Sequence, residues 1–317
     1  MQPSLNLTRE FNPIVSGLMG GLQEQTDREP DSQALLNALN RRAVHLLNDG
    51  KYPQAGPLTR VALDLAEREL GGEHPDTLAS LNNLAALYRA QGYYEKAEPL
   101  YQRALATSER VLGLEHPGTL TSLNNLALLY LAKGRYEEAE PLLQRALAAF
   151  ERVLGTEHSR TLTSLNNLAG LYKSQSRHEE AEPLYRRALA TFERVLGPEH
   201  PDTLTSLNNL AGLYYAQGRH TEAEPLYRRA LAALERVLGP EHPDTLTTLN
   251  NLAVLYEAQG RHEEAEPLYR RALVARERIL GREHPDTLTI LNNLAALYEA
   301  QGRHKEAEPL YRRARGL

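Results

Sequence analysis

The feature of this chain that most restricts its fold is an internal repeat of 42 residues. Residues 197–238 and 239–280 differ at only seven positions, and a degenerate copy precedes the regular ones, from about Ser32 to Leu70. A fixed period of this kind indicates stacked supersecondary units rather than independent globular domains. We count seven units, with approximate bounds 32–73, 74–115, 116–157, 158–199, 200–241, 242–283 and 284–317.

Each unit has the pattern of two helices, which we name A and B. In the second unit we expect helix A from about Pro75 to Gln91, where apolar residues recur at a spacing of three and four. Pro75 suits a first turn, Asp76 or Thr77 is expected to cap it, and Gly92 to end it. Helix B is expected from about Tyr94 to Leu112. Because one such pair cannot bury both of its apolar sides, stacked pairs forming a solenoid are expected.

Eight positions of the second unit resemble the tetratricopeptide repeat (TPR) signature: Leu81, Leu84, Ala85, Tyr88, Gly92, Ala97, Tyr101 and Ala104. The 42-residue form, with Leu-Asn-Asn-Leu-Ala, Tyr-x-x-Ala-Glu-Pro-Leu and Glu-His-Pro-Asp, is similar to the repeats of kinesin light chains and their bacterial relatives. The resemblance covers about residues 32–315. It implies an all-α, right-handed superhelical solenoid of about seven helix-turn-helix units.

Residues 1–30 lack the repeat and carry no heptads, so a motor role, which would need a long coiled coil, is not implied. We expect this segment to be a disordered lead or an N-terminal cap on the first unit. The solenoid is then expected to occupy residues 31–317.

Composition excludes several classes of site. The chain has no cysteine, so it has neither disulfides nor thiolate metal sites, and we expect a cytoplasmic location. Its net charge of −5 leaves no excess of basic residues for phosphates, so neither nucleic acid nor a membrane is an expected partner. Six of the 11 histidines recur once per unit, too far apart to share a metal ion, and we expect them to cap helices or pack locally. No motif for a cofactor or for catalysis is present, so we expect neither a cofactor nor enzyme activity.

One arc of helix A lacks the apolar pattern, and the resemblance implies that it lines a concave groove. Its first asparagine recurs as Asn82, Asn124, Asn166, Asn208, Asn250 and Asn292, and its second as Asn83, Asn125, Asn167, Asn209 and Asn251. One position of the arc, which we name the variable track, changes freely: Arg89, Leu131, Lys173, Tyr215, Glu257 and Glu299.

These residue types predict a site for an extended peptide. An asparagine amide offers a donor and an acceptor, which match the C=O and N–H of one peptide group. The variable track would then contact the peptide's side chains, with basic groups at Arg89 and Lys173 and acidic groups at Glu257 and Glu299. As an alternative for the second asparagine, Asn83 and its equivalents bridge adjacent helices instead.

The sequence therefore predicts a non-catalytic scaffold that binds a protein or peptide segment in the groove. The alternative is an oligomerisation or sensor module of a larger signalling or defence protein, which would associate with itself through the ends of the array.

Overall fold

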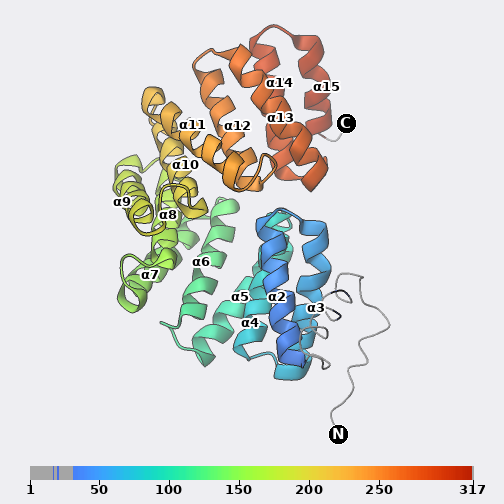
Figure 1. The fold of residues 1–317 in the computed structure, drawn as a ribbon, viewed down its shortest axis with the longest axis vertical. Coiled ribbons are helices and arrows are strands. Elements are labelled where there is room, and N and C mark those ends of the chain that lie inside the picture. Colours follow the sequence, from blue (N-terminus) through green and yellow to red (C-terminus); the bar gives the residue numbers. More distant parts are fainter. Residues whose placement is uncertain (1–16, 18–19, 21–30, 316–317) are drawn as a thin grey trace. The chain divides into compact units, whose positions relative to one another are not determined.

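The computed structural model describes residues 17, 20 and 31–315, and the expectation for residues 1–30 lies almost entirely outside them. Apart from short turns, residues 31–315 are helical (Figure 1). The A helices are α2 (Ser32–Asn48), α4 (Pro75–Ala90), α6 (Pro117–Ala132), α8 (Ser159–Ser174), α10 (Pro201–Ala216), α12 (Pro243–Ala258) and α14 (Pro285–Ala300). The B helices are α3 (Tyr52–Leu70), α5 (Tyr94–Val111), α7 (Tyr136–Leu154), α9 (His178–Leu196), α11 (His220–Val237), α13 (His262–Leu280) and α15 (His304–Ala314).

The chain divides into two compact parts, Met1–Leu129 and Tyr130–Leu317, with α6 crossing the division. In the first part, α2 packs on α3, α3 on α4, and α4 on α5. In the second part the same order continues without interruption from α7 to α15. The expected all-α solenoid of about seven helix pairs is confirmed.

The local sequence accounts for the helix bounds and for the core. Helices α4 and α5 end within one residue of the predicted positions. Five signature residues of this unit are fully buried: Leu81, Ala85, Ala97, Tyr101 and Ala104. Because the three alanines project only a methyl group, the two helices approach closely, and the ring of Tyr101 fills the space between them.

The N-terminal cap expected from Asp76 or Thr77 was wrong, whereas capping by the recurring histidines, one of the two roles expected for them, is seen. The Nδ1 atom of His74, rather than Asp76 or Thr77, accepts a hydrogen bond from the backbone N–H of Asp76 at 3.2 Å. Thr77 instead donates its hydroxyl to the carbonyl of Gly71 at 2.7 Å, which fastens the preceding loop to the helix. The other His-Pro histidines and His158 cap their helices in the same way, so these histidines have a structural role, as expected.

The turn between helices A and B needs a left-handed residue. Gly92 has φ of +77°, and glycine occupies the equivalent place in all other units but one. The exception is Ser176, which takes φ of +60° although its side chain disfavours that conformation. The turn geometry is therefore imposed by the packing of the two helices.

A ladder of side-chain hydrogen bonds connects consecutive A helices. In the first part, Asn82 donates Nδ2–H to the hydroxyl of Ser122 at 2.9 Å, and Asn125 donates to Oδ1 of Asn82 at 3.4 Å. In the second part, Asn166 donates to the hydroxyl of Ser206, and the second asparagine donates to the first of the preceding unit at Asn251–Asn208 and Asn293–Asn250.

This asparagine ladder fixes the register of the stack. Ser206 is fully buried and Asn166 is 7% exposed, so the Ser206 hydroxyl depends on the Asn166 amide for a partner. A shift of one unit by a single helical turn would break every rung at once. The asparagine pairs therefore stabilise one stacking arrangement among apolar surfaces that are otherwise almost identical.

One buried position departs from the apolar pattern. Arg276 on α13 replaces Phe150, Phe192 and Leu234 of earlier units, and is only 6% exposed. Its guanidinium pairs with Asp286 at 2.9 Å and donates to the Thr247 hydroxyl at 2.7 Å. It thereby joins α12 to α14 across the B helix that lies between them in the chain.

The ladder predicts that the same substitution, Asn to Ala, changes the free energy of unfolding by different amounts at Asn166 and at Asn292. Replacing Asn166 with Ala removes the donor of the buried Ser206 hydroxyl and should lower the free energy of unfolding by about 1–2 kcal/mol. Replacing Asn292, which is exposed on the last A helix described, should change it by less than about 0.5 kcal/mol. Urea titration followed by circular dichroism measures both, and equal effects would contradict a structural role for the ladder.

Candidate functional site

The A helices of the second part leave one side open. We define the A-helix face by the open positions on α8, α10, α12 and α14. Near the helix starts the exposed residues are Thr163, Thr205, Thr247 and Thr289, and at the helix ends they are Ser174, Ala216, Ala258 and Ala300. Between these two rows lies the variable track, where Lys173, Tyr215 and Glu257 are half-buried and Glu299 is exposed.

The predicted asparagines lie beneath or beside this face and carry the ladder. Asn124 and Asn166 are buried, at 8% and 7% exposure, and Asn292 is exposed. The remaining predicted asparagines are half-buried: Asn82, Asn83, Asn125, Asn167, Asn208, Asn209, Asn250 and Asn251. Bridging between adjacent helices, the alternative for the second asparagine, is seen at Asn83, Asn125 and Asn251. Contact of the amides with a ligand stays a prediction.

At Arg89, Glu257 and Glu299 the variable track lies against a tyrosine twelve residues later, on helix B of the same unit. The Tyr269 hydroxyl donates to Oε2 of Glu257 at 2.7 Å, and the Tyr311 hydroxyl donates to Oε2 of Glu299 at 2.9 Å. In the first part, burial raises the pKa of Tyr101, and the neighbouring Arg89 guanidinium opposes that rise. The tyrosines of the B helices therefore lie directly behind the variable track.

Sequence reasoning missed this pairing, although a signal for it was present. The only unit among the last six without the tyrosine has Leu143 in its place, and there the variable track carries Leu131. In this unit the variable track is apolar, at Leu131, and the tyrosine hydroxyl of helix B is absent, because Leu143 replaces the tyrosine. The two positions change together because a buried hydroxyl needs a polar neighbour.

Lys173 extends toward the next unit. A methyl group built on Gly212 of α10 would lie 3.3 Å from Nζ of Lys173 and 3.2 Å from the hydroxyl of Tyr227. Because Gly212 has no side chain, the ammonium group of Lys173 has room beside the Tyr227 hydroxyl. Burial lowers the pKa of Lys173, and burial also raises the pKa of Tyr227.

Tyr215 lies flat against a histidine of the following turn. Its ring is stacked on that of His220, with 5.5 Å between the ring centroids and 15° between the planes. His220 belongs to a position that is tyrosine in the second and third units. Aromatic side chains from the A–B turn thus border the variable track.

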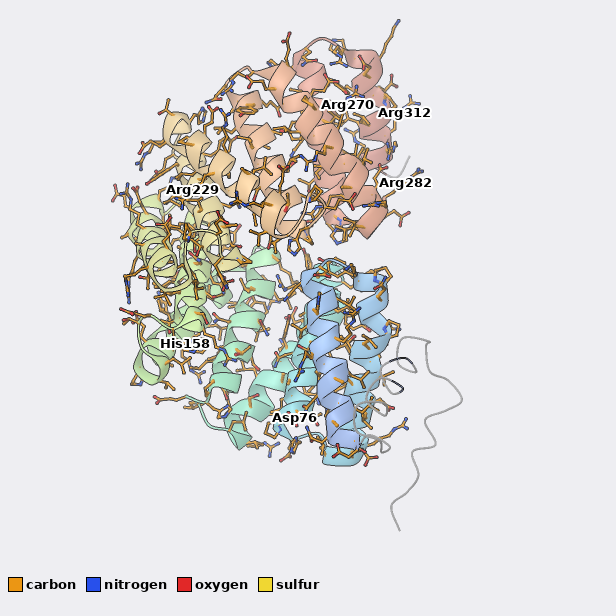
Figure 2. All side chains as sticks on the ribbon, in the orientation of Figure 1. Asp76, His158, Arg229, Arg270, Arg282 and Arg312 are labelled. Atoms are coloured by element: carbon orange, nitrogen blue, oxygen red, sulfur yellow. The ribbon has the colours of Figure 1, made fainter. Side chains whose placement is uncertain are left out.

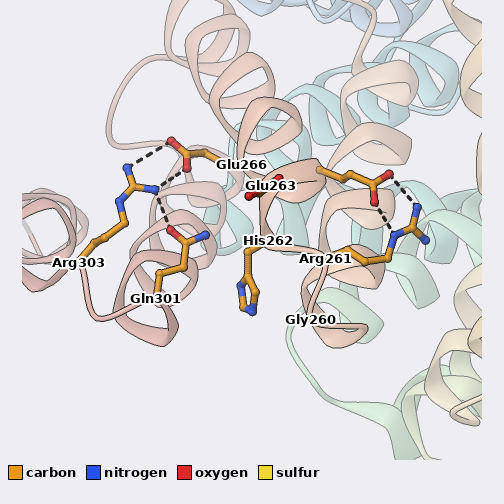
Figure 3. A pocket seen from close by; sticks show the side chains of 8 residues that line it. Gly260, Arg261, His262, Glu263, Glu266, Gln301 and Arg303 are labelled. Atoms are coloured by element: carbon orange, nitrogen blue, oxygen red, sulfur yellow. Dashed lines mark hydrogen bonds and ion pairs between the residues drawn. The ribbon is translucent and has the colours of Figure 1, made fainter.

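The turns between A and B helices carry a separate network of paired charges. Arg261 donates to Glu224 of the preceding unit at 2.7 Å and also pairs with Glu264 at 2.6 Å. Its guanidinium lies 4.0 Å from the centre of the Tyr256 ring. Arg177, Arg219 and Arg303 repeat this arrangement, and Figure 3 shows Arg303 reaching both Glu266 and Gln301.

Further ion pairs connect successive B helices. Arg187 pairs with Glu151 at 2.8 Å, and Arg229, labelled in Figure 2, pairs with Glu193 at the same distance. A second row near the loops includes Arg194 with Glu157 at 2.7 Å. Acidic residues of the array therefore neutralise many of its arginines.

A cavity of about 630 Å³ lies at the turns of the last two units, lined by Arg261, His262, Glu263, Glu264 and Glu266, together with Gly260, Gln301 and Arg303 (Figure 3). Both arginines in its wall already pair with carboxylates. Among the described residues no group of three or more His, Asp or Glu side chains is placed to hold a metal ion. None of the described helices is long and apolar enough to cross a membrane.

The sequence matches the model of the tetratricopeptide repeat in six overlapping stretches, at residues 34–110, 82–152, 119–194, 160–236, 205–277 and 247–317. The chain therefore belongs to the tetratricopeptide repeat family. No curated protein matches the sequence significantly.

Solved structures of the same kind include relatives with long repeats. The nearly identical TPR-like repeats of a Podospora anserina protein assigned to the kinesin light chains are 31% identical over 63% of this chain and 95% of that one, with a TM-score of 0.50. BtubC (BKLC) of P. vanneervenii is 26% identical over 78% of this chain and 92% of that one, with a TM-score of 0.53. NprR, solved with its cognate peptide NprX, shares the fold at 16% identity, covering 94% of this chain and 82% of that one, with a TM-score of 0.68.

The paired turn charges predict how stability depends on pH. Hydrogen bonds from Arg303, Tyr298 and Arg270 hold the pKa of Glu266 below its usual 4.5. A carboxyl group whose pKa is lower in the folded than in the unfolded state stabilises the fold above the unfolded value. This contribution is lost as the pH falls below about 4.5 and through the folded pKa, so the melting temperature should fall there.

Replacing Glu266 with Gln should make the melting temperature depend less on pH in the acid range, because the ionised group that the arginines stabilise is gone. Glu308→Gln is the control, since Glu308 is 64% exposed and pairs with Arg312 of its own helix. Calorimetric scans between pH 3 and 7 measure the three profiles. Identical slopes for wild type and Glu266→Gln would show that this carboxylate does not couple pH to folding.

Proposed function

We propose that this chain is a non-catalytic scaffold that holds an extended segment of a partner protein along the A-helix face. The observation that carries the proposal is a contrast between neighbouring positions on that face. Exposed residues stay small from unit to unit, whereas the variable track between them changes even where two units are otherwise almost identical.

This contrast suits a surface that accepts any backbone and distinguishes side chains. Ser174, Ala216, Ala258 and Ala300 project little from their helices, so a strand-like segment has room to lie across them. Gly212 and Tyr215 of the fifth unit become Val254 and Glu257 in the sixth, and these are two of only seven differences between the units. Differences placed on the open face change what the array presents to a partner.

The relatives support the same reading. NprR is a protein of this fold that was solved with a cognate peptide, so the architecture is suited to peptide recognition. In this chain the half-buried asparagines would add backbone hydrogen bonds with the amide atoms that the ladder leaves unused. A cytoplasmic location is part of the proposal, as the sequence led us to expect.

Filling the face should prevent binding without disturbing the fold. Ala216 and Ala258 are exposed on A helices, so replacing both with Trp adds bulk only to the open surface. Peptides selected from a random twelve-residue display library against the wild-type chain should bind the Ala216→Trp, Ala258→Trp variant at least about tenfold more weakly, a loss of 1.4 kcal/mol. Fluorescence anisotropy with the synthesised peptides measures the dissociation constants.

The matched control is Ala190→Trp with Ala232→Trp, since these alanines are exposed on the B helices α9 and α11. This variant should retain wild-type affinity, and circular dichroism should be the same for both. Peptides that bind the two double variants equally well, or a library that yields no binder, would overturn the proposal.

A further inference from the structure

Three charged groups of the A-helix face have no charged partner within the described chain, unlike most arginines of the turns and of the B helices. Arginines of the turns and B helices pair with glutamates of neighbouring units, as at Arg261–Glu224 and Arg187–Glu151. Among the described residues, Lys173, Glu257 and Glu299 make no ion pair. The array therefore neutralises many of its outer charges internally, whereas those of the variable track on α8, α12 and α14 are left for another molecule.

The ammonium group of Lys173 is held where an anion would reach it. It extends toward Gly212, and both Nζ of Lys173 and the hydroxyl of Tyr227 lie within 3.3 Å of where a Cβ of Gly212 would stand. Partial burial withdraws it from water, and no carboxylate of the described chain compensates for this loss. A carboxylate supplied by a ligand would restore the missing partner and could also accept a hydrogen bond from the tyrosine.

The opposite charge is held at the other end of the face. Tyr269 is fully buried, and its hydroxyl fixes the orientation of the Glu257 carboxylate at 2.7 Å. Tyr311 holds Glu299 of the next unit in the same way at 2.9 Å. Two oriented carboxylates without a cationic partner favour a ligand that carries lysine or arginine.

The stacking of the units sets the distance between these sites. Successive A helices from α8 to α14 contact one another, and packed helices lie about 8–10 Å apart. An extended chain advances about 3.3 Å per residue, so it crosses one unit in about three residues. Lys173 and Glu257 are two units apart, which corresponds to about six residues of ligand, and Glu299 lies about three residues further.

We propose that the A-helix face recognises an extended segment with an acidic residue at Lys173 and a basic residue about six positions away at Glu257, or nine at Glu299. This inference rests on the proposed function and specifies the chemistry of its ligand. Tyr215, between the two sites, contacts the middle of the segment through its ring.

The test is a selection of random twelve-residue peptides displayed on phage, carried out with the full-length chain. Peptides bound by the wild type should be enriched in an acidic and a basic residue about five to seven positions apart for Glu257, or about eight to ten for Glu299. Replacing the acidic residue of a selected peptide with its amide should weaken binding about fivefold, as expected for one ion pair of about 1 kcal/mol, and 0.5 M salt should reduce the difference.

The Lys173→Glu variant makes every charge of the variable track on α8 to α14 acidic, so its selected peptides should carry basic residues at both positions and lose the acidic one. Arg160→Glu is the control, because Arg160 is exposed on the same helix but lies outside the variable track. It should select the same peptides as the wild type.

The outcomes separate this inference from the function on which it rests. Binders that lack the charge pair but are blocked by Ala216→Trp with Ala258→Trp would overturn the inference and leave the proposed function standing. A selection that is unchanged by Lys173→Glu would have the same meaning. Failure to obtain any binder that this double variant blocks would overturn both.

Discussion

The hydrogen bonds between consecutive A helices are the interaction on which the rest of this structure depends. Apolar burial alone would hold identical hairpins together, but it is not directional and would tolerate sliding of one unit on the next. The asparagine ladder removes this freedom, because Asn82 and Asn166 reach a buried serine only in one register. Once the register is fixed, every variable-track residue stands at the same height on its helix, and the face becomes an ordered series of positions.

Much of the fold follows from the sequence, because each position of the repeat has similar neighbours in all seven units. The bounds of α4 and α5 and the burial of Ala85, Ala97 and Tyr101 could be predicted from spacing and side-chain size. The sequence left the capping residue open between Asp76, Thr77 and His74, and only the loop geometry places His74 Nδ1 within reach of the backbone.

The exposure of the helix A arc was predicted more successfully than the contacts that its residues make. The arc of helix A that lacks apolar residues is open, and Lys173, Tyr215, Glu257 and Glu299 lie on it. The contacts between units could not be predicted from the angular positions of residues on one helix. Those positions do not show whether Asn166 faces solvent or the next hairpin. For the same reason the contact between the track and the helix B tyrosines was missed. The sequence did hold a signal for it, because the unit with Leu131 on the track is also the one with Leu143 in place of the tyrosine.

The distribution of charge connects this architecture to function. Pairing between units at the turns and along the B helices neutralises many charges of the outer surface, whereas Lys173, Glu257 and Glu299 of the variable track make no ion pair with any described residue. A crystal structure of the chain with a selected peptide is the most direct test. The account predicts an extended peptide across α8 to α14, with its acidic side chain within 4 Å of Lys173 and a basic one at Glu257 or Glu299. A peptide bound to the B helices or the turns, with Lys173 uncontacted, would contradict it.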